Sequence, residues 1–237
     1  MKTHVRSPEV ASSHEKRHAF AVSAMVQIPI GPVTLMGDLR IPCDAAGLVL
    51  FAHGSGSSRH SPRNQAVARA LREAGNGTLL FDLLSRDEEA DDDRTGHLRF
   101  NIRLLAERLV AATRCVNSHS EAQQLPIGYF GASTGGAAAL VAAAELATEV
   151  KAVVSRGGRP DLAGNALPLV KAPVLLIVGG NDREVQRLNE DAYAQLNGEK
   201  KMVVVPGATH LFEEPRALEN VERLAAGWFQ QYFGARR

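Results

Sequence analysis

The chain has 237 residues, of which 45% are hydrophobic and 22% charged, and this predicts one domain with a sizeable core. The 27 basic and 26 acidic side chains leave a net charge of +1, and aromatic residues make up only 5%. A nucleic-acid partner would require a basic face or aromatic stacking platforms, so we expect none. The two cysteines, Cys43 and Cys115, form no disulfide framework, and we expect a reducing, cytoplasmic setting.

Residues 1–18 are polar and charged throughout, without the apolar stretch of a signal peptide. We expect a flexible N-terminal tail there, followed by a single domain over residues 19–237. The three histidines of this tail are expected to be solvated, so the sequence predicts no metal site. No apolar run approaches the ~20 residues that a membrane span requires, and we expect no membrane partner.

Strands and helices are predicted from residue 20 onward. Residues 20–30 and 33–41 flank the turn Gly31-Pro32, which indicates an antiparallel hairpin. Short, continuous apolar runs then indicate strands buried on both faces of a parallel sheet, at residues 47–54, 77–84, 126–133, 151–158, 172–180 and 201–208. Helical patterns lie between them, at residues 61–74, 97–118, 134–147, 184–197 and 214–234, the first opening at Ser61-Pro62 and the last at Glu214-Pro215.

This alternation predicts an α/β fold with a doubly wound, mostly parallel sheet of about eight strands. The sheet has an antiparallel start and helices on both faces. About seventeen residues separate the strand that ends near Val154 from the one that starts at Ala172. A helical lid would need several times that length, so we predict a site without a lid domain.

The sequence Gly-Ala-Ser-Thr-Gly at residues 131–135 matches the G-x-S-x-G pattern of a nucleophilic serine, here Ser133. It follows a predicted strand and precedes a helix of small residues, which is the context that this sharp turn requires. The N-terminus of that helix favours negative charge near the serine. A glycine-rich turn that only packs helix against sheet is the structural alternative.

A serine hydroxyl needs a base, and His210 is the single histidine that follows Ser133 in the chain. In this fold the order is serine, acid, histidine, which favours Asp182, just after the strand at 172–180. Its role would be to orient the imidazole and stabilise the imidazolium. Asp161 is the rival acid, and Glu213 and Glu214 lie too close to His210 in sequence to be favoured.

An oxyanion hole is predicted from the backbone N–H groups of Thr134 and Ser55. Ser55 lies in HGSGSSRH at residues 53–60, which follows an early strand. Gly54 and Gly56 also resemble the start of a dinucleotide-binding fingerprint, with Asp82 in the place of its ribose-binding acid. Arg59 stands where the third glycine should be, and the three catalytic candidates would remain unexplained, which disfavours a dinucleotide cofactor.

Taken together, HGSGSSRHSPRN, GYFGASTGG, VGGND and GATHLFEEP resemble the dienelactone-hydrolase-like branch of the α/β hydrolases, over residues 20–235. The resemblance implies a hydrolase without a lid that cleaves esters or lactones and uses no cofactor. Dienelactone hydrolases proper carry a cysteine where Ser133 stands. We therefore expect a general carboxylesterase with a Ser133, Asp182 and His210 triad.

Several arginines lie just beyond predicted strand ends, namely Arg59, Arg63, Arg86, Arg156, Arg159 and Arg183. One or two of them could bind a carboxylate of an anionic substrate, and Arg156 and Arg59 are the candidates. The acidic stretch at 87–93, expected to be a loop, could instead pair with these arginines.

We expect a small ester or lactone as the partner molecule, and the oligomeric state is left open. The alternatives are other reactions on the same triad, namely those of a thioesterase, peptidase, acyltransferase or perhydrolase. A non-catalytic binding protein on this scaffold is the third class of function. A complete triad disfavours it.

Overall fold

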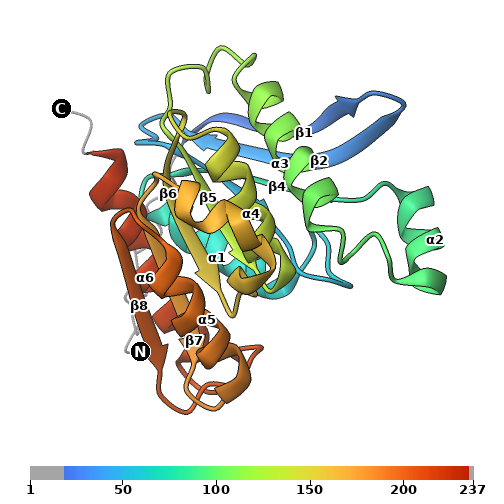
Figure 1. The fold of residues 1–237 in the computed structure, drawn as a ribbon. Helices are drawn as coiled ribbons and strands as arrows, with labels where there is room; N and C mark the ends of the chain where they lie inside the picture. Colours follow the sequence, from blue (N-terminus) through green and yellow to red (C-terminus); the bar gives the residue numbers. More distant parts are fainter. Residues whose placement is uncertain (1–18, 235–237) are drawn as a thin grey trace, which may run out of the picture.

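The computed structural model describes residues 19–234, so the predicted tail at 1–18 lies outside the described residues. One sheet is built in the order β1-β2-β4-β3-β5-β6-β7-β8 (Figure 1). The strands are β1 (Phe20–Ile30), β2 (Val33–Pro42), β3 (Leu48–Ala52), β4 (Gly77–Phe81), β5 (Ile127–Ala132), β6 (Val150–Arg156), β7 (Val174–Gly179) and β8 (Lys200–Val205).

The hairpin β1–β2 is antiparallel, and β2 also runs antiparallel to β4. Every pair from β4 through β3 to β8 is parallel. The predicted fold class, a mostly parallel sheet with an antiparallel start, is therefore confirmed. All residues of β3, β4, β5 and β7 are buried, as their continuous apolar runs predicted.

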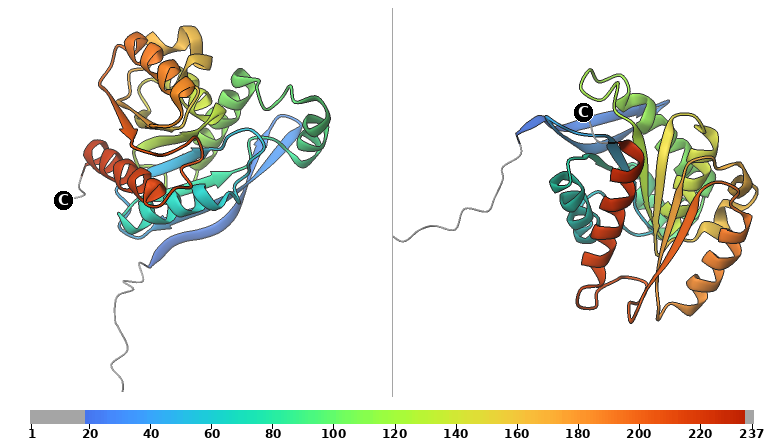
Figure 2. Two further views of the ribbon diagram at one scale, coloured as in Figure 1. Left: turned by 90° about the horizontal axis from the view of Figure 1, so that it is seen from below. Right: turned by 90° about the vertical axis from the view of Figure 1, so that its left-hand side faces the viewer.

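Helices cover both faces of the sheet (Figure 2). Helices α1 (Pro62–Glu73) and α6 (Ala217–Phe233) pack on one face, where Phe51, Phe130 and Phe229 are buried. Helices α3 (Ile102–Val116), α4 (Thr134–Glu145) and α5 (Arg183–Gln195) pack on the other, around Tyr129. The sheet therefore has a hydrophobic core on each side.

Two elements differ from the predictions. The acidic stretch expected to be a loop is helix α2 (Arg86–Thr95), because Ser85 and Glu88 form a capping box at its start. The connection between β6 and β7, where no element was predicted, holds a 3-10 segment, Pro160–Leu169. It carries no lid domain, as its length predicted. No helix within residues 19–234 is long and apolar enough to cross a membrane.

The ends of the other helices depart only slightly from expectation. Ser61 caps α1 as predicted, since its side chain accepts a hydrogen bond from the Asn64 N–H. The last helix begins at Ala217 and not at Glu214, because the Glu214 carboxylate accepts the Thr209 N–H in the preceding loop.

Candidate active site

Ser133 occupies the sharp turn between β5 and α4 with φ 51° and ψ −123°. L-residues adopt a positive φ rarely, so the surrounding packing must hold this conformation. A Cβ added to Gly135 would overlap the carbonyl oxygen of Ala52, and one added to Gly131 would overlap that of Gly135. The glycines thus let α4 lie directly against the sheet, with Ser133 at the carboxyl edge of the strands.

His210 and Asp182 form the pair that the chain order predicts. Nδ1 of His210 lies 2.7 Å from Oδ2 of Asp182. Asp182 follows β7, and His210 lies in the loop between β8 and α6. The Asp182 side chain is 15% exposed and that of His210 37%, so the imidazole is accessible while its carboxylate is largely sheltered. A proton on Nδ1 would leave Nε2 as the basic nitrogen.

The end of β6 links Ser133 to His210. The Ser133 N–H donates to the carbonyl of Arg156 at 3.3 Å, and the ring of His210 lies beside the next residue, Gly157. A Cβ on Gly157 would be 3.6 Å from Cε1 of His210. No hydrogen bond joins Ser133 and His210 in the part of the chain that the structure describes, and such bonds often tighten only once substrate binds.

The rival acids are engaged elsewhere. Asp161 accepts two hydrogen bonds from Arg159, at 2.9 and 2.8 Å. Glu213 pairs with Arg63 at 2.7 Å, and Glu214 accepts the Thr209 N–H at 3.0 Å. Asp182 is therefore the acid that the structure brings to His210.

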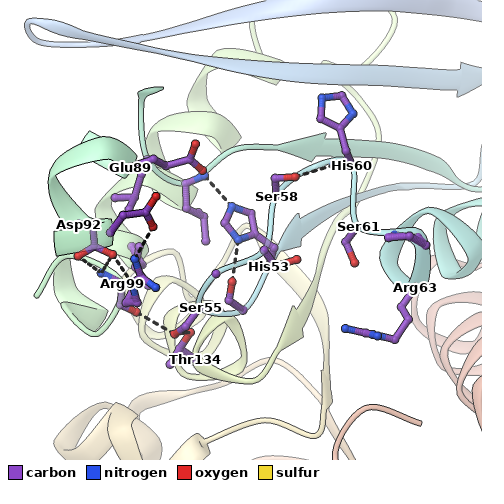
Figure 3. A pocket seen from close by; sticks show the side chains of 18 residues that line it. His53, Ser55, Ser58, His60, Ser61, Arg63, Glu89, Asp92, Arg99 and Thr134 are labelled. Atoms are coloured by element: carbon purple, nitrogen blue, oxygen red, sulfur yellow. Dashed lines mark hydrogen bonds and ion pairs between the residues drawn. The ribbon is translucent and has the colours of Figure 1, made fainter. Parts of the chain in front are cut away.

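Ser55 and Thr134, the two residues predicted to form the oxyanion hole, lie side by side. Their hydroxyl oxygens are 3.0 Å apart, in a hydrogen bond between the loop after β3 and the start of α4 (Figure 3). Within residues 19–234, no hydrogen bond engages the N–H of either residue. Gly54 packs so closely that a Cβ there would be 2.9 Å from Cβ of Ser133. This arrangement leaves two backbone donors beside the serine, as an oxyanion requires.

His53 was not assigned a role from the sequence, although it precedes Gly54 in the predicted oxyanion loop. Its Nε2 accepts the Leu83 N–H at 3.0 Å, and its Nδ1 lies 3.0 Å from the Gly54 carbonyl oxygen (Figure 3). Burial lowers the pKa of His53, so the imidazole is neutral with its proton on Nδ1. Through these two hydrogen bonds, the ring of His53 connects the loop after β3 (residues 53–60, called here the oxyanion loop) to Leu83, just after the end of β4.

A pocket of about 550 Å³ opens beside this loop. It extends from Arg63, at the start of α1, past Ser55 and Thr134 to α2 (Figure 3). Its lining is polar apart from Pro62, Leu83, Leu84 and Leu105. The pocket has the size of a small-molecule site. Among the described residues, no cluster of side chains suited to holding a metal ion was found.

The two arginines predicted to bind substrate have different surroundings. Arg59 pairs with Asp82, and its Nε lies 3.6 Å from Asp38, so two carboxylates already occupy its guanidinium. We therefore do not retain Arg59 as a substrate-binding residue. The same pairing engages Asp82, which argues further against a ribose-binding role.

Arg156 is buried and 5% exposed, and it forms no ion pair with a described carboxylate. Its Nη2 donates to Asn64 at a long 3.4 Å, and its guanidinium lies 5.8 Å from the centre of the Phe212 ring. Burial, together with the charge of nearby Arg63, lowers its pKa to about 10. Arg156 therefore remains a candidate for binding an anion.

The parallel sheet, the turn at Ser133 and the hydrogen-bonded His210 and Asp182 together define an α/β hydrolase without a lid domain. The sequence model of the dienelactone hydrolase family matches residues 42–233, and the chain belongs to this family.

Solved structures are similar over most of the chain. A dienelactone hydrolase from Anabaena variabilis is 59% identical with a TM-score of 0.87, and the match covers 89% of this chain and 98% of that one. A serine hydrolase without a lid from Xanthomonas campestris shares the fold, with 21% identity, a TM-score of 0.72 and 92% and 98% coverage.

A curated protein of Mycobacterium tuberculosis H37Rv is 55% identical over 204 residues, and it carries the provisional name of phosphoribosyl transferase. The match covers 86% of this chain but only 45% of that protein. The chain thus spans less than half the length of this relative. The family and the solved structures support a hydrolase of the esterase type.

Proposed function

We propose that the protein is a serine hydrolase that cleaves carboxylic esters or lactones through an acyl-enzyme on Ser133. The observation that carries the proposal is the hydrogen bond between His210 and Asp182 at the strand edge that also holds Ser133. Membership of the dienelactone hydrolase family supports the same chemistry.

In the first half of the reaction, Oγ of Ser133 attacks the ester carbonyl carbon and its proton passes to Nε2 of His210. The negative oxygen that forms is stabilised by the N–H groups of Ser55 and Thr134. The carbon–oxygen bond to the alcohol then breaks, and the alcohol leaves with the proton from His210. Asp182 keeps the imidazole oriented and stabilises its charged form.

In the second half, water attacks the acyl-enzyme and gives its proton to His210. The bond to Ser133 breaks, Ser133 regains a proton, and the carboxylic acid leaves. These steps need no cofactor.

Other reactions on the same triad stay open as alternatives, including thioester and peptide hydrolysis and acyl transfer. A non-catalytic binding protein is disfavoured because all three residues of the triad are present. We do not transfer the phosphoribosyl transferase name, since it belongs to a relative that mostly lies outside the match.

The expected cytoplasmic setting stays a prediction. Both described cysteines are free thiols, and Cys43 is exposed.

The test is hydrolysis of p-nitrophenyl acetate and butyrate by the wild type and by Ser133→Ala. We expect the variant to lose about a thousandfold or more of kcat, as when a triad member is removed. Equal turnover in the two proteins would refute the assignment of Ser133. If neither protein is active, labelling of the wild type by a fluorophosphonate separates a selective hydrolase from a binding protein.

A further inference from the structure

Most of the side chains that line the pocket beside the oxyanion hole carry hydrogen-bonding groups. Hydroxyl groups recur along its wall, from Ser55, Ser57, Ser58, Ser61 and Thr134. Small-molecule sites are usually lined mostly by apolar side chains with a few polar groups. A wall of hydroxyls favours a ligand that itself carries several hydrogen-bonding groups.

One end of this pocket is basic. Arg63 lines it, and Arg156 lies close enough behind for the two charges to interact. Among the described residues, Arg63 forms an ion pair with Glu213 alone, and the Glu213 side chain is 62% exposed. Nε of Arg63 and Nε of Arg156 are both buried without a hydrogen-bond partner among the described residues. Because Arg63 has one exposed carboxylate partner and Arg156 has none among the described residues, this end of the pocket carries an excess positive charge suited to an anion.

The other end of the pocket is acidic, but much of its charge is neutralised. Asp92 and Asp93 both pair with Arg99. Glu89 also lines the pocket and forms no ion pair with a described residue. Its burial, and the nearby charges of Asp82 and Asp93, raise its pKa. A carboxyl group in this setting is well suited to bind a ligand hydroxyl group.

We propose that this pocket binds the part of the ester that carries a phosphate and several hydroxyl groups, as in an ester of a phosphorylated polyol. The phosphate lies at Arg63, with the buried charge of Arg156 behind it, and the hydroxyl groups lie along the serine wall towards Glu89. Phosphate suits this place because it can accept hydrogen bonds from the Arg63 guanidinium, and the first turn of α1 also lines the pocket there. The inference rests on the proposed esterase function for its meaning, but its test does not require catalysis.

Binding is measured by calorimetry on the Ser133→Ala protein, with glycerol 3-phosphate, inorganic phosphate and glycerol as probes. We expect glycerol 3-phosphate to bind several-fold more tightly than inorganic phosphate, and glycerol alone to bind least. Adding the substitution Arg63→Gln should weaken the binding of both phosphate-containing probes about tenfold or more. Arg63→Lys should keep part of the affinity because it retains the charge. Adding the substitution Glu213→Gln should strengthen the binding of both phosphate-containing probes, because it removes the carboxylate that competes for Arg63.

Two further variants complete the design. Arg103→Ala removes an arginine that is 89% exposed on α3, and it should leave all affinities unchanged. Glu89→Ala should reduce the preference for glycerol 3-phosphate over inorganic phosphate but not the binding of phosphate itself. The inference is overturned if no phosphate probe binds, if Arg63→Gln and Arg103→Ala have equal effects, or if glycerol 3-phosphate has no advantage. A failed esterase assay with these binding results intact would refute only the proposed reaction.

Discussion

The role of His53 depends on a single buried nitrogen. Its Nε2 accepts the Leu83 N–H, and this bond is lost if that nitrogen is protonated. Burial opposes the charged form and lowers the pKa, although the Gly54 carbonyl and the charge of Asp82 act in the other direction. The oxyanion loop is therefore held by a histidine that must stay neutral.

This gives a pH dependence with a definite sign. In the unfolded chain His53 takes up a proton near its usual pKa of about 6.5, whereas in the folded protein it does so only at lower pH. The unfolded state thus binds more protons below pH ~6.5. We expect the free energy of unfolding to fall as pH is lowered from there towards the folded-state pKa.

Urea unfolding of wild type and His53→Gln across this pH range measures the effect. The free energy of unfolding of the variant should change less with pH than that of the wild type, since glutamine can accept a hydrogen bond but does not titrate. His97→Gln, at an exposed histidine, is the control and should keep the wild-type slope. Identical slopes for wild type and His53→Gln would contradict this account.

At the scale of elements, the turn that carries Ser133 depends on how closely α4 packs on the sheet. A Cβ on Gly135 would overlap the Ala52 carbonyl oxygen and lie 2.6 Å from that of His53. Both contacts are with backbone atoms, which cannot rotate away as a side chain can. The helix would have to move, and the catalytic turn with it.

Two helical glycines allow a matched comparison by urea unfolding. Gly135→Ala should lower the free energy of unfolding by about 3 kcal/mol. Gly227→Ala, in α6 with no atom within 4 Å of the added carbon, should raise it by about 0.5–1 kcal/mol. Equal effects of the two substitutions would show that helix propensity and not close packing decides the outcome at Gly135.

The elements also show where sequence reasoning succeeded and failed. Continuous apolar runs predicted every parallel strand, because burial on both faces favours such runs. The predicted burial is wrong for β8, which lies at the edge of the sheet and has only Val205 buried. Helix α2 has no apolar periodicity, and its only signal in the sequence is the spacing of Ser85 and Glu88, which form a capping box. The triad candidates followed from chain order, whereas the partners of Arg59 and the role of His53 depend on contacts between distant segments.

At the scale of the whole molecule, stability should be highest at the centre of the sheet and lowest at its antiparallel edge. Strands β3 and β5 are buried throughout, while β1 pairs only with β2 and leaves Phe20 42% and Met25 66% exposed. Regions with few buried contacts open at a small fraction of the global free energy. The first half of β1 is therefore the expected place of local opening.

Native-state hydrogen exchange followed by mass spectrometry tests this. Amides at residues 20–25 should exchange orders of magnitude faster than those of β3 and β5. Protection of residues 20–25 equal to that of β3 would contradict the expectation, since it would require a cover over this edge.

The short connection between β6 and β7 has a consequence for how selectivity can arise. Within residues 19–234 the connection between β6 and β7 carries no domain that could cover Ser133. In the proposed reaction, a wrong ester therefore cannot be rejected by closure of a lid domain. Discrimination must come after encounter, from how long a molecule stays aligned and how often it departs unreacted. In the proposed reaction, the residues that line the pocket next to the oxyanion hole set how long a molecule stays bound, and a molecule that they do not hold diffuses away before Ser133 can react.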